Sequence, residues 1–96
     1  MNSTRTRTRR AVFTDAQGNI TLQVEAIASV GIADLAQVQS HQINHIAGST
    51  SHVVHFTGGG RLCYAYNERG RIIDVSAWHV MLRLGPENQC IFSALS

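Results

Sequence analysis

Histidine is the residue type in this chain that could most readily do chemistry. The sequence of 96 residues contains five histidines. An imidazole can ligate a transition metal or transfer a proton near neutral pH. Four of the five fall within residues 41–55, and the fifth lies further along: His41, His45, His52, His55 and His79.

The spacing of these histidines argues against a complete metal site. His41 and His45 are four residues apart, but the sequence around them predicts a strand, in which four residues span about 13 Å. Two ligands of one zinc ion cannot be that far apart. If residues 41–47 and 51–57 form a hairpin centred on Ser49, His45 lies diagonal to His55 on one face, with about 7 Å between the Cα atoms. A third ligand would have to come from His79 or from a second subunit, so we interpret the histidines as polar residues on a half-solvated strand and predict no metal or cofactor.

Catalytic patterns are weak. The segment Gly48-Ser49-Thr50-Ser51 favours a turn over the G-x-S-x-G nucleophile motif. Cys63 and Cys90 stand among apolar residues, which do not activate a thiol. Asp74 and Glu25 have no acidic neighbour that would complete a carboxylate pair. We therefore predict no catalytic residue and a protein that is not an enzyme.

Aromatic residues are few, so their placement is informative. Tyr64 and Tyr66 are two residues apart and point the same way from a strand. Exposed tyrosine and tryptophan are typical of contact surfaces. The candidate residues for a ligand or partner surface are Tyr64, Tyr66, Trp78, His45 and His55.

Positive charge is confined to the N-terminus. Residues 1–10 have a net charge of +4, whereas residues 11–96 contain four arginines and six acidic residues and have a net charge of −2. Binding of nucleic acid would therefore depend on the tail, through contacts with phosphates that salt weakens. The tail could also extend the first hairpin or remain a solvated terminus. The arginines concerned are Arg5, Arg7, Arg9 and Arg10.

Size and composition predict one globular domain at residues 11–96, preceded by a flexible tail at residues 1–10. Only 15% of the residues are charged, and a charge-poor surface favours association. We expect a homodimer or larger assembly. Because the sequence has no apolar run of membrane-spanning length and no signal-peptide core, we expect a cytoplasmic protein without membrane contact.

Strand and turn signals recur every eight to twelve residues, which predicts an α+β fold that is mainly β. We expect an antiparallel meander of six to eight strands, twisted or partly closed into a barrel. The three-residue spacing of Ile32, Leu35 and Val38 predicts one short helix near residues 30–39, capped by Ser29. The loop from Asn67 to Gly70 predicts a type I turn closed by glycine. Its register places four apolar residues on one face: Leu62, Tyr64, Ile73 and Val75.

One local resemblance involves this turn. The segment from Gly60 to Ile72, with Tyr66-Asn67-Glu68-Arg69-Gly70 at its centre, resembles a single unit of the tyrosine–aspartate (Rhs-type) repeats, and residues 15–21 echo its second half. Those families stack many adjacent units. Here the two segments lie far apart, so we interpret both as hairpin turns and transfer no function.

Taken together, these features favour a small, self-associating protein-interaction or inhibitory module without enzymatic activity, of the kind that mobile elements carry. Two alternatives stay open. One is a nucleic-acid-associated accessory protein that uses the arginine tail. The other is a small-molecule-binding or enzymatic barrel that uses the histidines and tyrosines.

Overall fold

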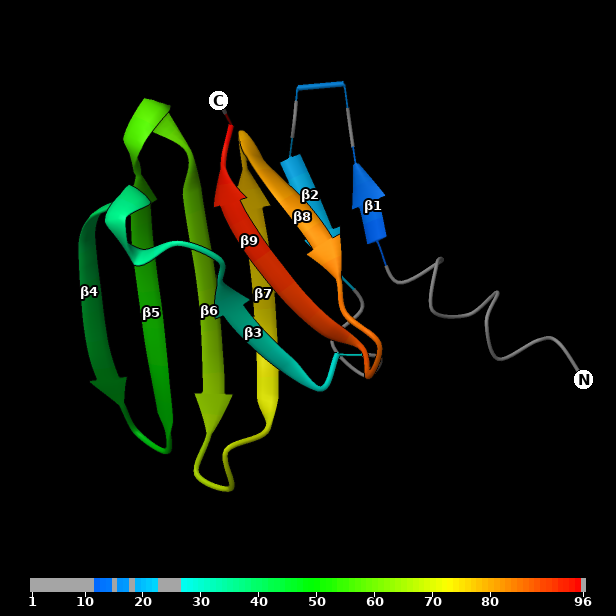
Figure 1. Cartoon of the computed structure of the whole chain (residues 1–96). Coiled ribbons are helices and arrows are strands. Elements are labelled where there is room, and N and C mark those ends of the chain that lie inside the picture. Colours follow the sequence, from blue (N-terminus) through cyan, green and yellow to red (C-terminus); the bar gives the residue numbers. More distant parts are fainter. Residues whose placement is uncertain (1–11, 15, 18, 23–26, 96) are drawn as a thin grey trace, which may run out of the picture.

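The computed structural model describes residues 12–14, 16, 17, 19–22 and 27–95. Over these residues the strands form two sheets (Figure 1). The six-stranded sheet has the order β1-β2-β7-β6-β5-β4, and the three-stranded sheet has the order β3-β9-β8. The strands are β1 (Val12–Thr14), β2 (Asn19–Leu22), β3 (Ser29–Ile32), β4 (Val38–Ile46), β5 (Ser49–Phe56), β6 (Arg61–Asn67), β7 (Ile72–Trp78), β8 (Val80–Leu84) and β9 (Gln89–Ala94).

The prediction of a mainly β, antiparallel fold is confirmed. Strands β4 to β7 follow one another as antiparallel hairpins, as a meander requires. Two pairings depart from a simple meander, because β2 joins the sheet beside β7 and β3 lies parallel to β9. In the part of the chain that is described, the two sheets stay separate and do not close into a barrel.

The predicted helix near residues 30–39 is wrong. Residues Ser29–Ile32 form β3, and only Leu35–Gln37 form a short 3-10 turn, η2. The Asp34 carboxylate caps this turn by accepting a hydrogen bond of 3.0 Å from the backbone N–H of Ala36. Leu35, which the helix would have buried, is 74% exposed. Strand pairing of β3 with the distant β9 determines the structure here, rather than the helical preference that the three-residue spacing suggests. The predicted α+β class is therefore corrected to mainly β.

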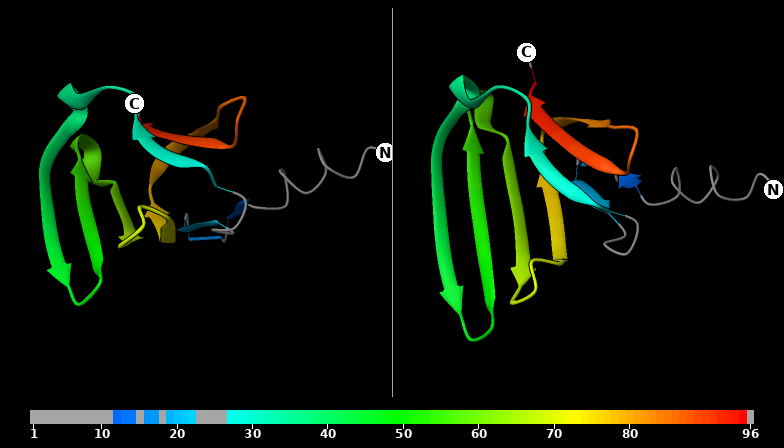
Figure 2. Two further views of the ribbon diagram at one scale, coloured as in Figure 1. Left: turned by 90° about the horizontal axis from the view of Figure 1, so that it is seen from below. Right: turned by 60° about the horizontal axis from the view of Figure 1, so that its bottom comes forward.

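The hydrophobic core lies between the two sheets. We call the side of the six-stranded sheet that faces the three-stranded sheet its inner face. The three-stranded sheet lies over one part of this face, and β4 and β5 extend beyond it (Figure 2). The buried side chains are Ile20, Leu22, Val54, Phe56, Leu62, Tyr64, Ile72, Val75 and Ala77 from the first sheet and Val80, Cys90, Phe92 and Ala94 from the second.

The turn between β6 and β7 has the predicted form. Gly70 adopts a φ of 78°, a conformation that glycine tolerates at no steric cost. The Asn67 Oδ1 atom accepts hydrogen bonds from the N–H groups of Arg69 and Arg71, at 2.9 and 3.0 Å. A bulge beside Ala65 shifts the register beyond the turn.

Because of that bulge, the predicted inner face of β7 is wrong at one position. Ile72 is buried, whereas Ile73 is 46% exposed. The other three predicted residues, Leu62, Tyr64 and Val75, are buried as expected.

Candidate functional site

The inner face changes character from the centre of the sheet to its β4 edge. The register places Val75, Tyr64, His52 and Ile43 in one row across four strands. Val75 and Tyr64 are buried, His52 is half-buried, and Ile43 is 51% exposed. Toward the β4 edge, the core therefore gives way to a surface that carries histidine and tyrosine side chains.

Four side chains form one aromatic cluster on this surface, which we call the His–Tyr cluster: His41, His52, Tyr64 and Tyr66. The Nε2 atom of His41 lies 2.8 Å from the Nδ1 atom of His52. The His52 ring stacks on Tyr64 with a centroid distance of 4.6 Å and an interplanar angle of 4°. Tyr66 meets the rings of His52 and Tyr64 edge-on, at 5.9 and 5.7 Å. Each ring thus holds the orientation of the next.

Two side chains of the cluster, His52 and Tyr64, favour their uncharged forms. Burial lowers the pKa of His52, and the nearby imidazoles of His41 and His45 lower it further. Burial also raises the pKa of Tyr64, with a smaller contribution from Tyr66. At neutral pH, His52 and Tyr64 are therefore a neutral stacked pair.

Among the described strands, β4 is the last in the six-stranded sheet and pairs with β5 alone, so it forms an open edge there (Figure 1). It is nine residues long, and every residue after Val38 is exposed. Its sequence, VQSHQINHI, contains no Lys, Arg, Asp, Glu or Pro. Charged residues and proline on an edge strand are common protection against pairing with other chains, and β4 has neither.

The backbone groups that β4 presents at this edge can be assigned. The N–H of Phe56 donates to the carbonyl of Gly60 at 2.8 Å, so Phe56 is bonded to β6. Because bonding direction alternates along an antiparallel strand, the even-numbered residues of β5 bond to β6 and the odd-numbered residues bond to β4. The register pairs these odd-numbered residues with even-numbered residues of β4. The N–H and C=O groups that point away from the sheet therefore belong to His41, Ile43 and His45.

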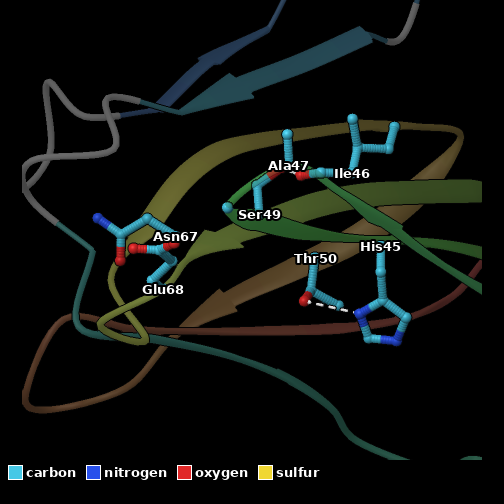
Figure 3. A pocket seen from close by; sticks show the side chains of 8 residues that line it. His45, Ile46, Ala47, Ser49, Thr50, Asn67 and Glu68 are labelled. Atoms are coloured by element: carbon cyan, nitrogen blue, oxygen red, sulfur yellow. Dashed lines mark hydrogen bonds between the residues drawn. The ribbon is translucent and has the colours of Figure 1, made fainter.

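An open hollow lies at the end of the β4–β5 hairpin, beside the turn between β6 and β7 (Figure 3). It has a volume of about 340 Å³ and polar walls that include Ser49, Thr50, Asn67 and Glu68. His45 stands at its rim, where its Nδ1 atom lies 3.2 Å from Thr50 Oγ1. Gly48 has a φ of 82°, and a Cβ atom at this position would lie 3.4 Å from the Oε2 atom of Glu68. The hollow is open to solvent and lies at the end of the strands, between the β4–β5 turn and the β6–β7 turn.

The predicted juxtaposition of His45 and His55 is wrong. The hairpin turns at Ala47-Gly48, so that Ile46 pairs with Ser49 and His45 pairs with Thr50. This register differs by three residues from one centred on Ser49, and an odd shift exchanges the two faces. His45 lies on the inner-face side, whereas His55 is exposed on the opposite face, between Ser40 and Arg61.

The structure separates the predicted aromatic residues. Tyr64 and Tyr66 share the inner face, as their spacing predicts. Trp78 pairs with Arg61 on the opposite face, and its Nε1–H donates to the carbonyl of Gln17 at 2.9 Å. His41 and His52 belong to the cluster but were missed as site residues, because their contact depends on a register that the sequence pattern does not determine.

Other chemistry has little support in the described residues. They contain no group of three or more His, Cys, Asp or Glu side chains placed to hold a metal ion. Cys63 and Cys90 are both free thiols, and burial raises the pKa of Cys90. The Ser49 hydroxyl donates to the Ile46 carbonyl at 3.0 Å within its turn. The four tail arginines lie outside the described residues.

Within the part of the chain that is described, no helix combines the length and the apolar character needed to cross a bilayer. Comparison with known proteins finds no family model, curated protein or solved structure that matches the chain.

Proposed function

We propose that this protein is a non-enzymatic protein-interaction module whose contact surface is the open edge and adjoining inner face of strands β4 and β5. The observation that carries the proposal is β4 itself, an exposed nine-residue edge strand without a charged residue or proline. Such an edge accepts an extended polypeptide as an additional strand, through main-chain hydrogen bonds.

The side chains of this surface favour contact with protein. Ile43 and Ile46 are 51% and 65% exposed and lie on the same strand as two histidines and four amide or hydroxyl side chains. The N–H and C=O groups of His41, Ile43 and His45 point toward the open edge. The side chains of β4 project alternately from its two faces, so both would flank an added strand. Main-chain bonds would supply affinity, and the flanking side chains would supply specificity.

The His–Tyr cluster supports this role by bracing the strand pair behind the edge. The contacts of His41 and His52 join β4 to β5, and the stack of His52 on Tyr64 joins β5 to β6. An edge that is already held in the extended conformation loses less conformational freedom when it binds.

A photo-crosslinking side chain at Gln42 tests the proposal in the native cell. Gln42 is exposed at the middle of β4, and Ile73, which is 46% exposed on β7, provides a matched control position. We expect Gln42 to crosslink to polypeptide, including other copies of the chain, and Ile73 to crosslink much less. Equal labelling at the two positions, or none at Gln42, would contradict the proposal.

A further inference from the structure

We infer that the polypeptide that pairs with β4 is a second copy of this chain, in an antiparallel dimer whose two-fold axis passes beside Ile43. This inference rests on the proposed function, because it names the partner of the same edge. The dimer would join two six-stranded sheets into one continuous sheet.

The regular part of β4 sets the position of the axis. The β4–β5 ladder is interrupted between Val38 and Ser40 and ends at the turn after Ile46. The uninterrupted stretch is therefore Ser40–Ile46, and its middle residue is Ile43. With a two-fold axis at Ile43, the stretch Ser40–Ile46 of one copy pairs along its full length with the same stretch of the other copy, running in the opposite direction.

The outward backbone groups have the same centre. They belong to His41, Ile43 and His45, which are symmetric about Ile43. With the axis at Ile43, the Ile43 residues of the two copies form one hydrogen-bonded pair, and His41 of each copy pairs with His45 of the other. Every outward N–H and C=O of the regular stretch then has a partner, as an antiparallel ladder requires.

The side chains are compatible with this register. On the inner-face side, the two exposed Ile43 side chains would cover each other. On the opposite face, Gln42 of each copy would lie beside Asn44 of the other, where the two amides can exchange hydrogen bonds. β4 contains no carboxylate, ammonium or guanidinium group. Pairing two copies therefore places no like charges of these kinds opposite each other, an arrangement that would destabilise the strand pair.

Neighbouring registers are worse. If the β4 strand of the second copy is shifted by two residues in one direction, the ladder between the copies extends across the interruption at Val38 and Ser40. Moving it in the other direction leaves only Gln42–Ile46 paired, because the ladder then reaches the turn at Ala47. Both alternatives separate the Ile43 side chains and place each of them opposite a histidine.

The surroundings of the edge permit a second copy. No strand or turn of the described residues lies beside β4 on the side away from β5 (Figures 1 and 2). One strand pair buries less surface than the roughly 1,200–2,000 Å² of a standard stable interface, so we expect a weak, reversible dimer.

Disulfide trapping with purified full-length chain tests the register directly. In a Cys63→Ala background, Gln42→Cys and Asn44→Cys proteins are oxidised separately and as a mixture. A non-hydrogen-bonded antiparallel pair has Cα atoms about 4.5 Å apart, within the disulfide range of about 4.4–6.8 Å. We expect rapid trapping of the mixed dimer and slow trapping of either protein alone. Rapid self-trapping of Gln42→Cys or of Asn44→Cys would identify one of the shifted registers and overturn the axis at Ile43.

Sedimentation velocity over a range of concentrations tests the dimer itself. Proline at position 43 removes an outward N–H without breaking a bond to β5. Edge strands tolerate proline where the N–H would face solvent. We expect Ile43→Pro to weaken the dimer about tenfold or more, because two hydrogen bonds between the copies are lost. The control Ile43→Val keeps the N–H group and should dimerise normally, and circular dichroism checks the fold of both variants.

The two proposals fail in different ways. A strictly monomeric wild-type chain at every concentration would overturn the self-pairing, even if Gln42 crosslinks to another polypeptide in cells, in which case the proposed function stands. A monomeric chain whose Gln42 also crosslinks to nothing would overturn both.

Discussion

The Nε2 atom of His41 on β4 lies 2.8 Å from the Nδ1 atom of His52 on β5, diagonally across the strand pair. This contact links the edge strand to the aromatic stack of His52 on Tyr64 and so to the buried core. Because one imidazole nitrogen must donate to the other, the contact requires at least one of the two facing nitrogens to be unprotonated.

Acidification should therefore destabilise the fold through His52. Its pKa is lowered in the folded protein by burial and by the neighbouring imidazoles of His41 and His45, so in this range the unfolded chain binds more protons than the folded one. Stability from this group is fully present above about pH 6.5, the usual histidine value, and is lost as the pH falls through the lower, folded-state value. Urea unfolding of dilute protein from pH 8 to pH 5 measures it. The rings of Tyr64 and Tyr66 also contact the His52 ring on the inner face.

The matched variants for that experiment are His52→Gln and His55→Gln. His52→Gln should flatten the decline in stability below about pH 6.5. His55 is exposed on the opposite face, and its replacement should leave the pH profile unchanged. An identical slope in wild type and His52→Gln would show that other groups cause the acid sensitivity.

The interior between the two sheets should be sensitive to cavity formation. Phe92 on β9 is fully buried, and Phe92→Ala should reduce the free energy of unfolding by about 3–5 kcal/mol. Leu35→Ala is the control, because Leu35 is 74% exposed and its truncation should change stability by no more than about 0.5 kcal/mol. Chemical denaturation of the two variants beside wild type decides whether the second sheet is packed as described.

Glycine is required where β6 begins. A Cβ atom on Gly60 would collide with the carbonyl oxygen of His79 and with the side chain of Val80, at the crossing from β7 to β8. Gly60→Ala should destabilise the protein by about 1–3 kcal/mol through overpacking. Gly31→Ala provides the contrast, since a Cβ atom there meets nothing within 4 Å. Comparable melting temperatures for the two variants would mean that the close approach at Gly60 is absent.

Sequence reasoning succeeded where the determining signal is local. The Asn67–Gly70 turn follows from asparagine and glycine at fixed positions, and the hairpins of β4 to β7 follow from alternating strands between such turns. It failed where the signal is distant. Residues Ser29–Ile32 became a strand because β9, some sixty residues later, pairs with them in parallel.

The candidate site shows the same division more sharply. The sequence identified the histidine-rich hairpin and the Tyr64–Tyr66 face, but assigned His45 and His55 to one face. A turn at Ala47-Gly48 instead of one centred on Ser49 is a small local difference, yet it exchanges the faces of the strand. Register therefore decided that His41 and His52 meet, and composition could not reveal this.

The claim that β4 is an open edge that closes on a second strand is most directly tested by residue-resolved hydrogen exchange of the purified chain. In dilute protein, the amides of Gln42 and Asn44 should be protected by β5, and those of His41, Ile43 and His45 should exchange rapidly. As the concentration rises, we expect these three amides to gain protection together. If all three exchange equally fast at every concentration, the edge does not pair with itself; if they are already protected in dilute protein, the edge is not open.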